Sequence, residues 1–79
     1  MKVKVNYWMK VEDVLEVDDK FEGAMDENPD GTFTEEAEGL SAECGDVVYE
    51  MLQAKHGHGA FTCDDISIET MSGGLIYEL

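Results

Sequence analysis

Basic side chains are scarce in this sequence. It contains no arginine and only five lysines, against nineteen aspartate and glutamate residues, which gives a formal net charge of −14 at pH 7. A surface of that sign repels nucleic acid and anionic membranes, so neither is expected as a direct partner, and it attracts basic protein surfaces. Like charges also destabilise the compact state, so we expect a core or a bound partner to offset their repulsion.

Long hydrophobic runs are missing too. No segment has the roughly 20 consecutive apolar residues that a membrane-spanning helix requires. The opening residues, MKVKVNYWMK, alternate charged and apolar side chains and lack the continuous apolar stretch of a secretory signal. We therefore expect a cytoplasmic protein. The chain has 79 residues, of which 43% are hydrophobic, and this is enough for one small core. A single domain spanning residues 1–79 is expected.

Cysteine is represented only by Cys44 and Cys63, which follow no spacing typical of metal ligands. In a cytoplasmic protein both are expected to be buried thiols, with a disulfide between them as the alternative. His56, His58 and Cys63 together offer three possible zinc ligands, but their spacing fits no zinc finger. We therefore predict no metal ligands among these residues.

Motifs for catalysis are absent from the sequence. It has no phosphate-binding loop, no nucleophile elbow and no arginine to clamp an anion. Cys44 is predicted to face the core, where a thiol stays protonated and unreactive. Acidic pairs are numerous, but nothing singles out one pair for acid–base work, and so small a core leaves little volume for a substrate pocket. We expect neither enzymatic activity nor a cofactor.

Strict alternation of apolar and polar residues marks the N-terminal segment. Apolar side chains occupy every odd position from 1 to 11, which is typical of a half-buried strand. Glu12 and Asp13 suit a turn, and a second strand is predicted from Leu15 to Phe21. The alternation fails at Asp19, which indicates either a bulge or a mistaken register there. The polar face of this hairpin is predicted to place lysines beside acids, namely Lys2, Lys4 and Lys10 beside Glu16, Asp18 and Glu22.

Residues 34–56 have the three- and four-residue periodicity of an amphipathic helix. Its apolar stripe consists of Ala37, Leu40, Cys44, Val47, Val48, Met51 and Leu52. Thr34 is predicted to cap the first turn, and Gly57 to end the helix in a left-handed conformation. Gly39 and Gly45 each weaken the helix interior by about 1 kcal/mol.

The last segment, CDDISIETMSGGLIYEL, is predicted to form a second hairpin. Ile66 and Ile68 alternate with polar residues, the letters SGG suit a tight turn, and Leu75, Tyr77 and Leu79 alternate again. The resulting order is strand, strand, helix, strand, strand. It predicts an α+β domain in which a four-stranded antiparallel sheet packs on one amphipathic helix.

The letters DENPDG at residues 26–31 match the opening of an EF-hand calcium loop, with Asp26, Asn28 and Asp30 as possible ligands. Such a loop needs a bidentate carboxylate at its twelfth position, which is Ala37 here. The preceding segment is also predicted to be a strand, where an EF-hand has a helix. The letters NPDG suit a type I turn, so we predict a structural turn and keep calcium binding as the alternative.

Acidic residues are predicted to cover the outer face of the helix. Glu36, Glu43, Asp46 and Glu50 lie within about 80° of one another around the helix, opposite the apolar stripe. Glu35 and Glu38 widen this row, which runs along roughly 25 Å. We predict that these six acids bind a basic partner, with an ordinary solvated helix face as the alternative. Trp8 is predicted to be an exposed partner anchor, or else to cover the lysine stems of the hairpin.

The ending ISIETMSGGLIYEL, the acidic composition and the strand–helix–hairpin layout resemble small phage-encoded takeover proteins, including anti-CRISPR and anti-restriction inhibitors. The resemblance implies a stoichiometric inhibitor in the host cytoplasm, a monomer or a small homo-oligomer, which blocks nucleic acid access to a host defence complex. It transfers no functional residue. Two other functions stay open: a metal-binding domain that uses the Asp26–Asp30 turn, and an acidic domain whose charge serves solubility in concentrated salt.

Overall fold

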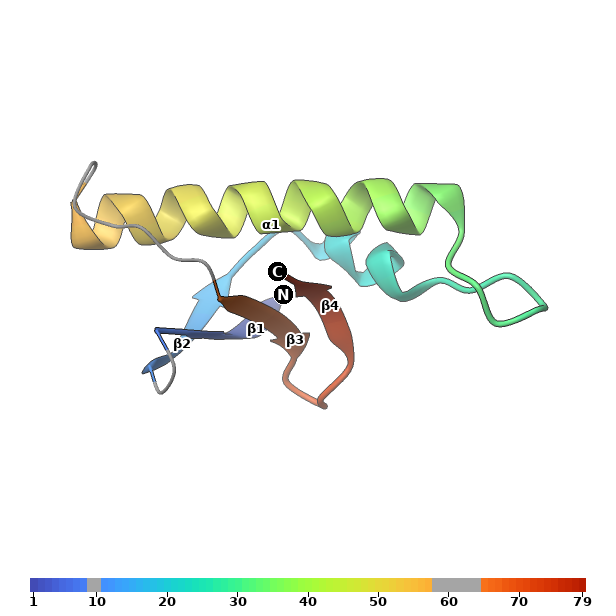
Figure 1. The fold of residues 1–79 in the computed structure, drawn as a ribbon, viewed down its shortest axis with the longest axis horizontal. Coiled ribbons are helices and arrows are strands. Elements are labelled where there is room, and N and C mark those ends of the chain that lie inside the picture. The colour runs from blue at the N-terminus through green and yellow to red at the C-terminus, as the bar shows by residue number, and fades with distance from the viewer. Residues whose placement is uncertain (9–10, 58–64) are drawn as a thin grey trace.

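One long helix lies along one face of a four-stranded antiparallel sheet (Figure 1). The computed structural model describes residues 1–8, 11–57 and 65–79. The elements follow one another as β1 (Lys2–Tyr7), β2 (Val11–Glu16), the 3₁₀ helix η1 (Asp19–Met25), α1 (Glu35–His56), β3 (Ile66–Thr70) and β4 (Leu75–Glu78). The predicted α+β fold with ββαββ order is therefore confirmed.

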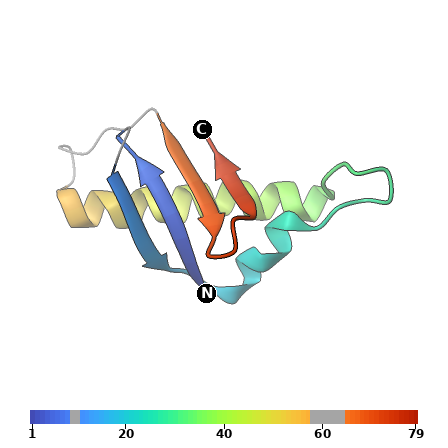
Figure 2. The ribbon, with the colours of Figure 1, turned by 90° about the horizontal axis from the view of Figure 1, so that it is seen from below.

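The two hairpins join at the centre of the sheet. The strand order is β2-β1-β3-β4, and every neighbouring pair is antiparallel. The pairing of β1 with β3 places residues from the two ends of the chain side by side, with Val5 opposite Ile68. The strands β2 and β4 form the two edges, and α1 crosses behind all four strands (Figure 2).

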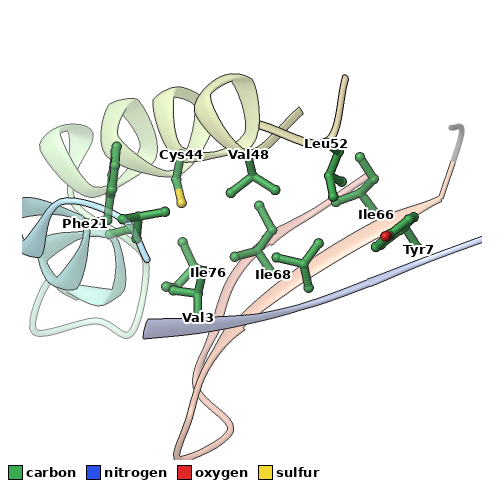
Figure 3. Close-up of a cluster of buried hydrophobic side chains, with 12 residues drawn as sticks. Val3, Tyr7, Phe21, Cys44, Val48, Leu52, Ile66, Ile68 and Ile76 are labelled. Carbon is green, nitrogen blue, oxygen red and sulfur yellow. The ribbon is translucent and has the colours of Figure 1, made fainter. Parts of the chain in front are cut away.

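The core fills the space between α1 and the sheet face that it covers (Figure 3). The core side chains are Val3, Val5 and Tyr7 of β1, Val17 after β2, Phe21 and Ala24 of η1, Cys44, Val48 and Leu52 of α1, Ile66 and Ile68 of β3, and Ile76 of β4. Burial of these apolar side chains drives folding at about 25 cal/mol per Å². The odd positions of β1 face the helix, as the period-two pattern predicts.

The chain reverses earlier in the first hairpin than predicted. Tyr7 pairs with Val11, so Glu12 and Asp13 lie within β2 instead of forming the turn. Trp8 follows β1 with φ 48°, in the left-handed region that favours a tight reversal. The alternation runs through this reversal without a break in the sequence, and for this reason the pattern does not mark it. Of the predicted lysine–acid neighbours, Lys2 lies opposite Glu16, whereas the prediction for Lys10 falls outside the described residues.

The predicted end of the second strand is wrong, because residues 19–25 form the 3₁₀ helix η1 instead. The Asp18 carboxylate accepts a hydrogen bond from the backbone N–H of Lys20 at 2.9 Å and so caps this helix. Phe21 and Ala24 are both buried, at the three-residue spacing of a 3₁₀ helix. Asp18 and Glu22 therefore do not stand beside the lysines of β1. Lys4 instead pairs with Glu69 of β3 at 3.9 Å.

The helix α1 agrees with its prediction. The Thr34 hydroxyl accepts a hydrogen bond from the backbone N–H of Ala37 at 3.0 Å, as predicted. The helix ends at Gly57 with a positive φ of 96°, but its ψ of 127° lies outside the left-handed helical region that was predicted. The predicted apolar stripe faces the sheet, and its residues are buried or partly buried. Within the described part of the chain, no helix has both the length and the apolar character needed to span a membrane.

A register shift changes which residues of β4 face the core. Ile68 lies opposite Tyr77 but Glu69 lies opposite Leu75, so Ile76 is the extra residue of a β-bulge. Ile76 is buried, whereas Leu75 and Leu79 are exposed. The alternation predicted for this strand from Leu75, Tyr77 and Leu79 is therefore interrupted.

Candidate partner-binding surface

The predicted acidic face lies along α1, the long helix that covers the sheet (Figure 1). Its members are all exposed, namely Glu35, Glu36, Glu38, Glu43, Asp46 and Glu50. Glu43 differs from the others because Lys20 of η1 donates a hydrogen bond to its carboxylate at 2.8 Å. The other five form no ion pair within the described residues. We call this set of five acids, none of which forms an ion pair with a described residue, the acidic helix face.

The lysines that the structure describes are mostly engaged elsewhere. Lys4 reaches Glu69, and Lys20 reaches Glu43. Lys55 donates to both carboxylate oxygens of Asp13, at 2.8 and 2.9 Å. The hydrogen bond to Glu43 raises the pKa of Lys20, so this lysine is firmly cationic at neutral pH. These three lysines therefore already have acidic partners, and Lys2 stands opposite Glu16 in the sheet.

Trp8 lies at the C-terminal end of α1. Its side chain is 42% exposed, and its ring centroid lies 5.1 Å from the ring of His56 and 5.5 Å from the ring of Tyr7. The indole therefore packs against the last residue of the helix. This half-exposed position suits a partner anchor, one of the two roles predicted for Trp8.

A polar cluster that the sequence did not predict joins α1 to the first hairpin. The Tyr7 hydroxyl donates to the Asp13 carboxylate at 2.6 Å, and it lies 2.9 Å from Nε2 of His56. The hydrogen bond from Lys55, and then that from Tyr7, lowers the pKa of Asp13. The sequence feature that could have indicated this cluster is that Asp13 occupies an odd position of β2, between the apolar residues Val11 and Leu15. An inward-pointing charge on an edge strand discourages pairing with other strands.

The loop at residues 26–34 is held by its own hydrogen bonds. The Gly31 N–H donates to the Asn28 carbonyl at 2.9 Å, which closes the predicted turn. Thr32 donates to the Asp30 carboxylate from its backbone N–H at 3.0 Å and from its hydroxyl at 2.6 Å. These bonds lower the pKa of Asp30. The predicted structural turn is confirmed, and one of the three possible calcium ligands already serves as a hydrogen-bond acceptor within it.

Of the predicted cysteine and histidine residues, the structure describes Cys44 and His56. Cys44 is a buried free thiol on the sheet-facing side of α1, and burial raises its pKa to about 11. Such a thiol is protonated at neutral pH and is a poor nucleophile. The predictions for His58 and Cys63 fall outside the described residues. Among the residues that are described, no three His, Cys, Asp or Glu side chains are arranged to hold a metal ion.

No protein family, curated protein or solved structure matches this chain in a comparison with known proteins. The resemblance to phage-encoded inhibitors consequently stays a prediction.

Proposed function

We propose that this chain is a non-catalytic acidic binding protein that occupies the basic nucleic-acid-binding groove of a partner protein and blocks access to it. The observation that supports this proposal is the acidic helix face, in which five exposed acids lie on one helix and form no ion pair with a described residue. The most specific form of the proposal is an inhibitor of a host defence complex, of the anti-CRISPR or anti-restriction kind.

The physical basis is an imitation of phosphate charge. Glu36 and Glu50 are fourteen positions apart, which corresponds to about 21 Å along a helix axis. Duplex DNA carries one negative charge per roughly 1.7 Å of its axis, and its partners meet that charge with lysine and arginine. A groove built for phosphates therefore attracts a rigid row of carboxylates. Because the attraction is between exposed charges, added salt should weaken it steeply.

The test compares variants with the same change in net charge. The first variant carries Glu36→Lys, Asp46→Lys and Glu50→Lys on the acidic helix face. Its matched control carries Glu12→Lys, Glu22→Lys and Glu27→Lys, three exposed acids outside α1. Each tagged protein is used for a pull-down from a bacterial lysate at low salt. The captured partner is identified by mass spectrometry and then tested for binding to a fluorescent DNA or RNA duplex.

We expect the wild-type chain and the control variant to capture a basic partner, to release it between about 0.1 and 0.5 M KCl, and to displace the duplex from it. The helix-face variant should capture little of it. Equal capture by the helix-face variant and the wild type would show that this face plays no part in binding. A captured partner that keeps its duplex in the presence of excess wild-type chain would contradict inhibition by charge imitation.

A further inference from the structure

A groove of about 340 Å³ lies between β4 and the N-terminal half of α1. Apolar side chains form most of its lining, with the acids Glu38 and Glu78 also contributing. Phe33 and Leu75 line the groove and are each 48% exposed. Such a volume lies at the lower end of the range for ligand pockets, so it suits one or two large apolar side chains. Phe33 and Leu75 thus bring two half-exposed apolar side chains together at one groove, and clustered exposed apolar surface is typical of contact sites.

The groove runs beside an open sheet edge. The Leu79 N–H donates to the Ile66 carbonyl at 2.9 Å, which makes Ser67 and Glu78 a pair without hydrogen bonds between them. The backbone N–H and C=O of Glu78 consequently point away from β3 and towards the open edge. Two residues earlier in β4, the Ser41 hydroxyl of α1 donates to the Ile76 carbonyl at 2.6 Å, so this carbonyl is already occupied. An added segment would therefore pair at Glu78 and extend along the groove.

We propose that this groove binds an extended, lysine- or arginine-containing segment of the partner protein. The segment pairs with the backbone of Glu78 and places an apolar side chain between Phe33 and Tyr77. Charge complementarity selects this occupant, because Glu38 and Glu78 line the groove of a chain whose net charge is −14. A second copy of the chain would bring a further −14 to the same edge, and the repulsion disfavours it. The inference rests on the proposed function only in requiring a basic partner.

Synthetic peptides test the groove without the natural partner. The probe is a fluorescein-labelled nine-residue peptide in which lysine alternates with valine. The first control peptide has serine in place of valine and the same charge. The second has the probe's side chains but carries N-methyl groups on alternate residues, which removes backbone donors from one edge. Fluorescence anisotropy at about 50 mM KCl gives the dissociation constants, low salt being chosen because exposed charges are then weakly screened.

Two protein variants complete the test. Ala42→Gln fills the groove from α1, and Ala54→Gln is its matched control, because Ala54 is exposed on the same helix but does not line the groove. We expect the lysine–valine peptide to bind at least about tenfold more tightly than either control peptide. Ala42→Gln should weaken its binding about tenfold and Ala54→Gln should leave it unchanged.

Equal binding of the lysine–valine and lysine–serine peptides would overturn the inference, because charge alone would then account for it. Equal binding of the N-methylated peptide would overturn the role of the β4 edge. A dimer in sedimentation velocity that Ala42→Gln dissociates would show that a second copy fills the groove, and would also overturn it. These outcomes leave the proposed function intact, since that proposal fails only in the pull-down with the helix-face variant or in the duplex displacement.

Discussion

The ring of Tyr77 lies against the backbone of Gly45, so closely that a Cβ atom added to Gly45 would stand 2.7 Å from Cζ of the ring. This contact brings β4 up against α1 and shapes one wall of the groove. Gly39 lies in the same helix, but an added Cβ there would meet no atom within 4 Å. By helix propensity alone the two glycines weaken α1 equally. Of the two, only Gly45 lies where an added Cβ atom would clash with another side chain.

Alanine substitution at the two glycines should therefore have opposite effects on stability. Gly39→Ala should raise the free energy of unfolding by about 0.5 to 1 kcal/mol, because alanine has the higher helix propensity. Gly45→Ala should lower it by up to about 2 kcal/mol, because the clash with the Tyr77 ring outweighs the same propensity gain. Urea unfolding followed by circular dichroism at 222 nm measures both values.

The same Gly45→Ala substitution in a chain without the Tyr77 ring shows whether the clash with this ring causes the loss of stability. In a Tyr77→Ala chain the ring is gone, so Gly45→Ala should become neutral or stabilising there, and the double-mutant cycle should give a coupling of about 1 kcal/mol or more. If Gly45→Ala were equally destabilising with and without the Tyr77 ring, the contact with this ring would not be the reason.

The helix and the fold class were predictable because local signals and burial agree. The stripe from Ala37 to Leu52, the Thr34 cap and the Gly57 end all specify the same element, and the structure places it at Glu35–His56. The first reversal was not predictable in the same way. Residues on both sides of it keep the period-two pattern, so the register depends on the pairing of Tyr7 with Val11 across the hairpin. The bulge at Ile76 has the same origin, because it arises between two strands.

In the candidate site too, features of a single element were predictable, whereas contacts between elements were not. A helical projection predicts correctly that these acids are exposed on α1, because that property depends on α1 alone. It does not predict that Lys20, 23 residues earlier in the chain, neutralises Glu43. The groove between Phe33 and Tyr77 was missed for this reason as well. Its walls come from a loop, a helix and a strand that meet only in the folded chain.

The Asp13 cluster predicts a loss of stability in acid. The pKa of Asp13 is lowered in the folded state by Lys55 and Tyr7, relative to about 3.9 in an unfolded chain. A carboxyl with a lowered folded pKa stabilises the fold above its unfolded pKa, and this contribution disappears as the pH falls through its folded pKa. Asp13→Asn should therefore lower the free energy of unfolding by about 1 to 2 kcal/mol at pH 7 and by much less at pH 2.

Urea unfolding between pH 2 and pH 7 measures this difference. Asp46→Asn is the matched control, because Asp46 is exposed on the acidic helix face and forms no ion pair among the described residues. It should leave stability at pH 7 unchanged or slightly higher. A constant difference between Asp13→Asn and the wild type across this range would mean that the Asp13 charge contributes nothing.

Burial of Cys44 predicts an unreactive thiol. Its pKa is raised to about 11, and its side chain is enclosed between α1 and the sheet. In a Cys63→Ser chain, where Cys44 is the single cysteine, alkylation by iodoacetamide at pH 7.5 should be at least about 100-fold slower in the folded protein than in urea. Mass spectrometry of timed samples measures both rates. Comparable rates in the two states would contradict the buried position of this thiol.

Self-repulsion among the acids predicts that salt stabilises the folded chain. Exposed charges interact over about 30 Å at 0.01 M salt but over only about 3 Å at 1 M. The net charge of −14 should therefore cost more free energy at low salt, so the thermal midpoint should rise by several degrees, about 1 kcal/mol, between 0.01 and 1 M KCl. The Glu36→Lys, Asp46→Lys, Glu50→Lys variant has a net charge nearer zero, and its midpoint should rise less. Thermal melts followed by circular dichroism measure both slopes.

A wild-type chain that is unfolded without salt would indicate adaptation to concentrated salt. A midpoint that falls with salt would instead show that the ion pairs of Lys4, Lys20 and Lys55 outweigh the repulsion.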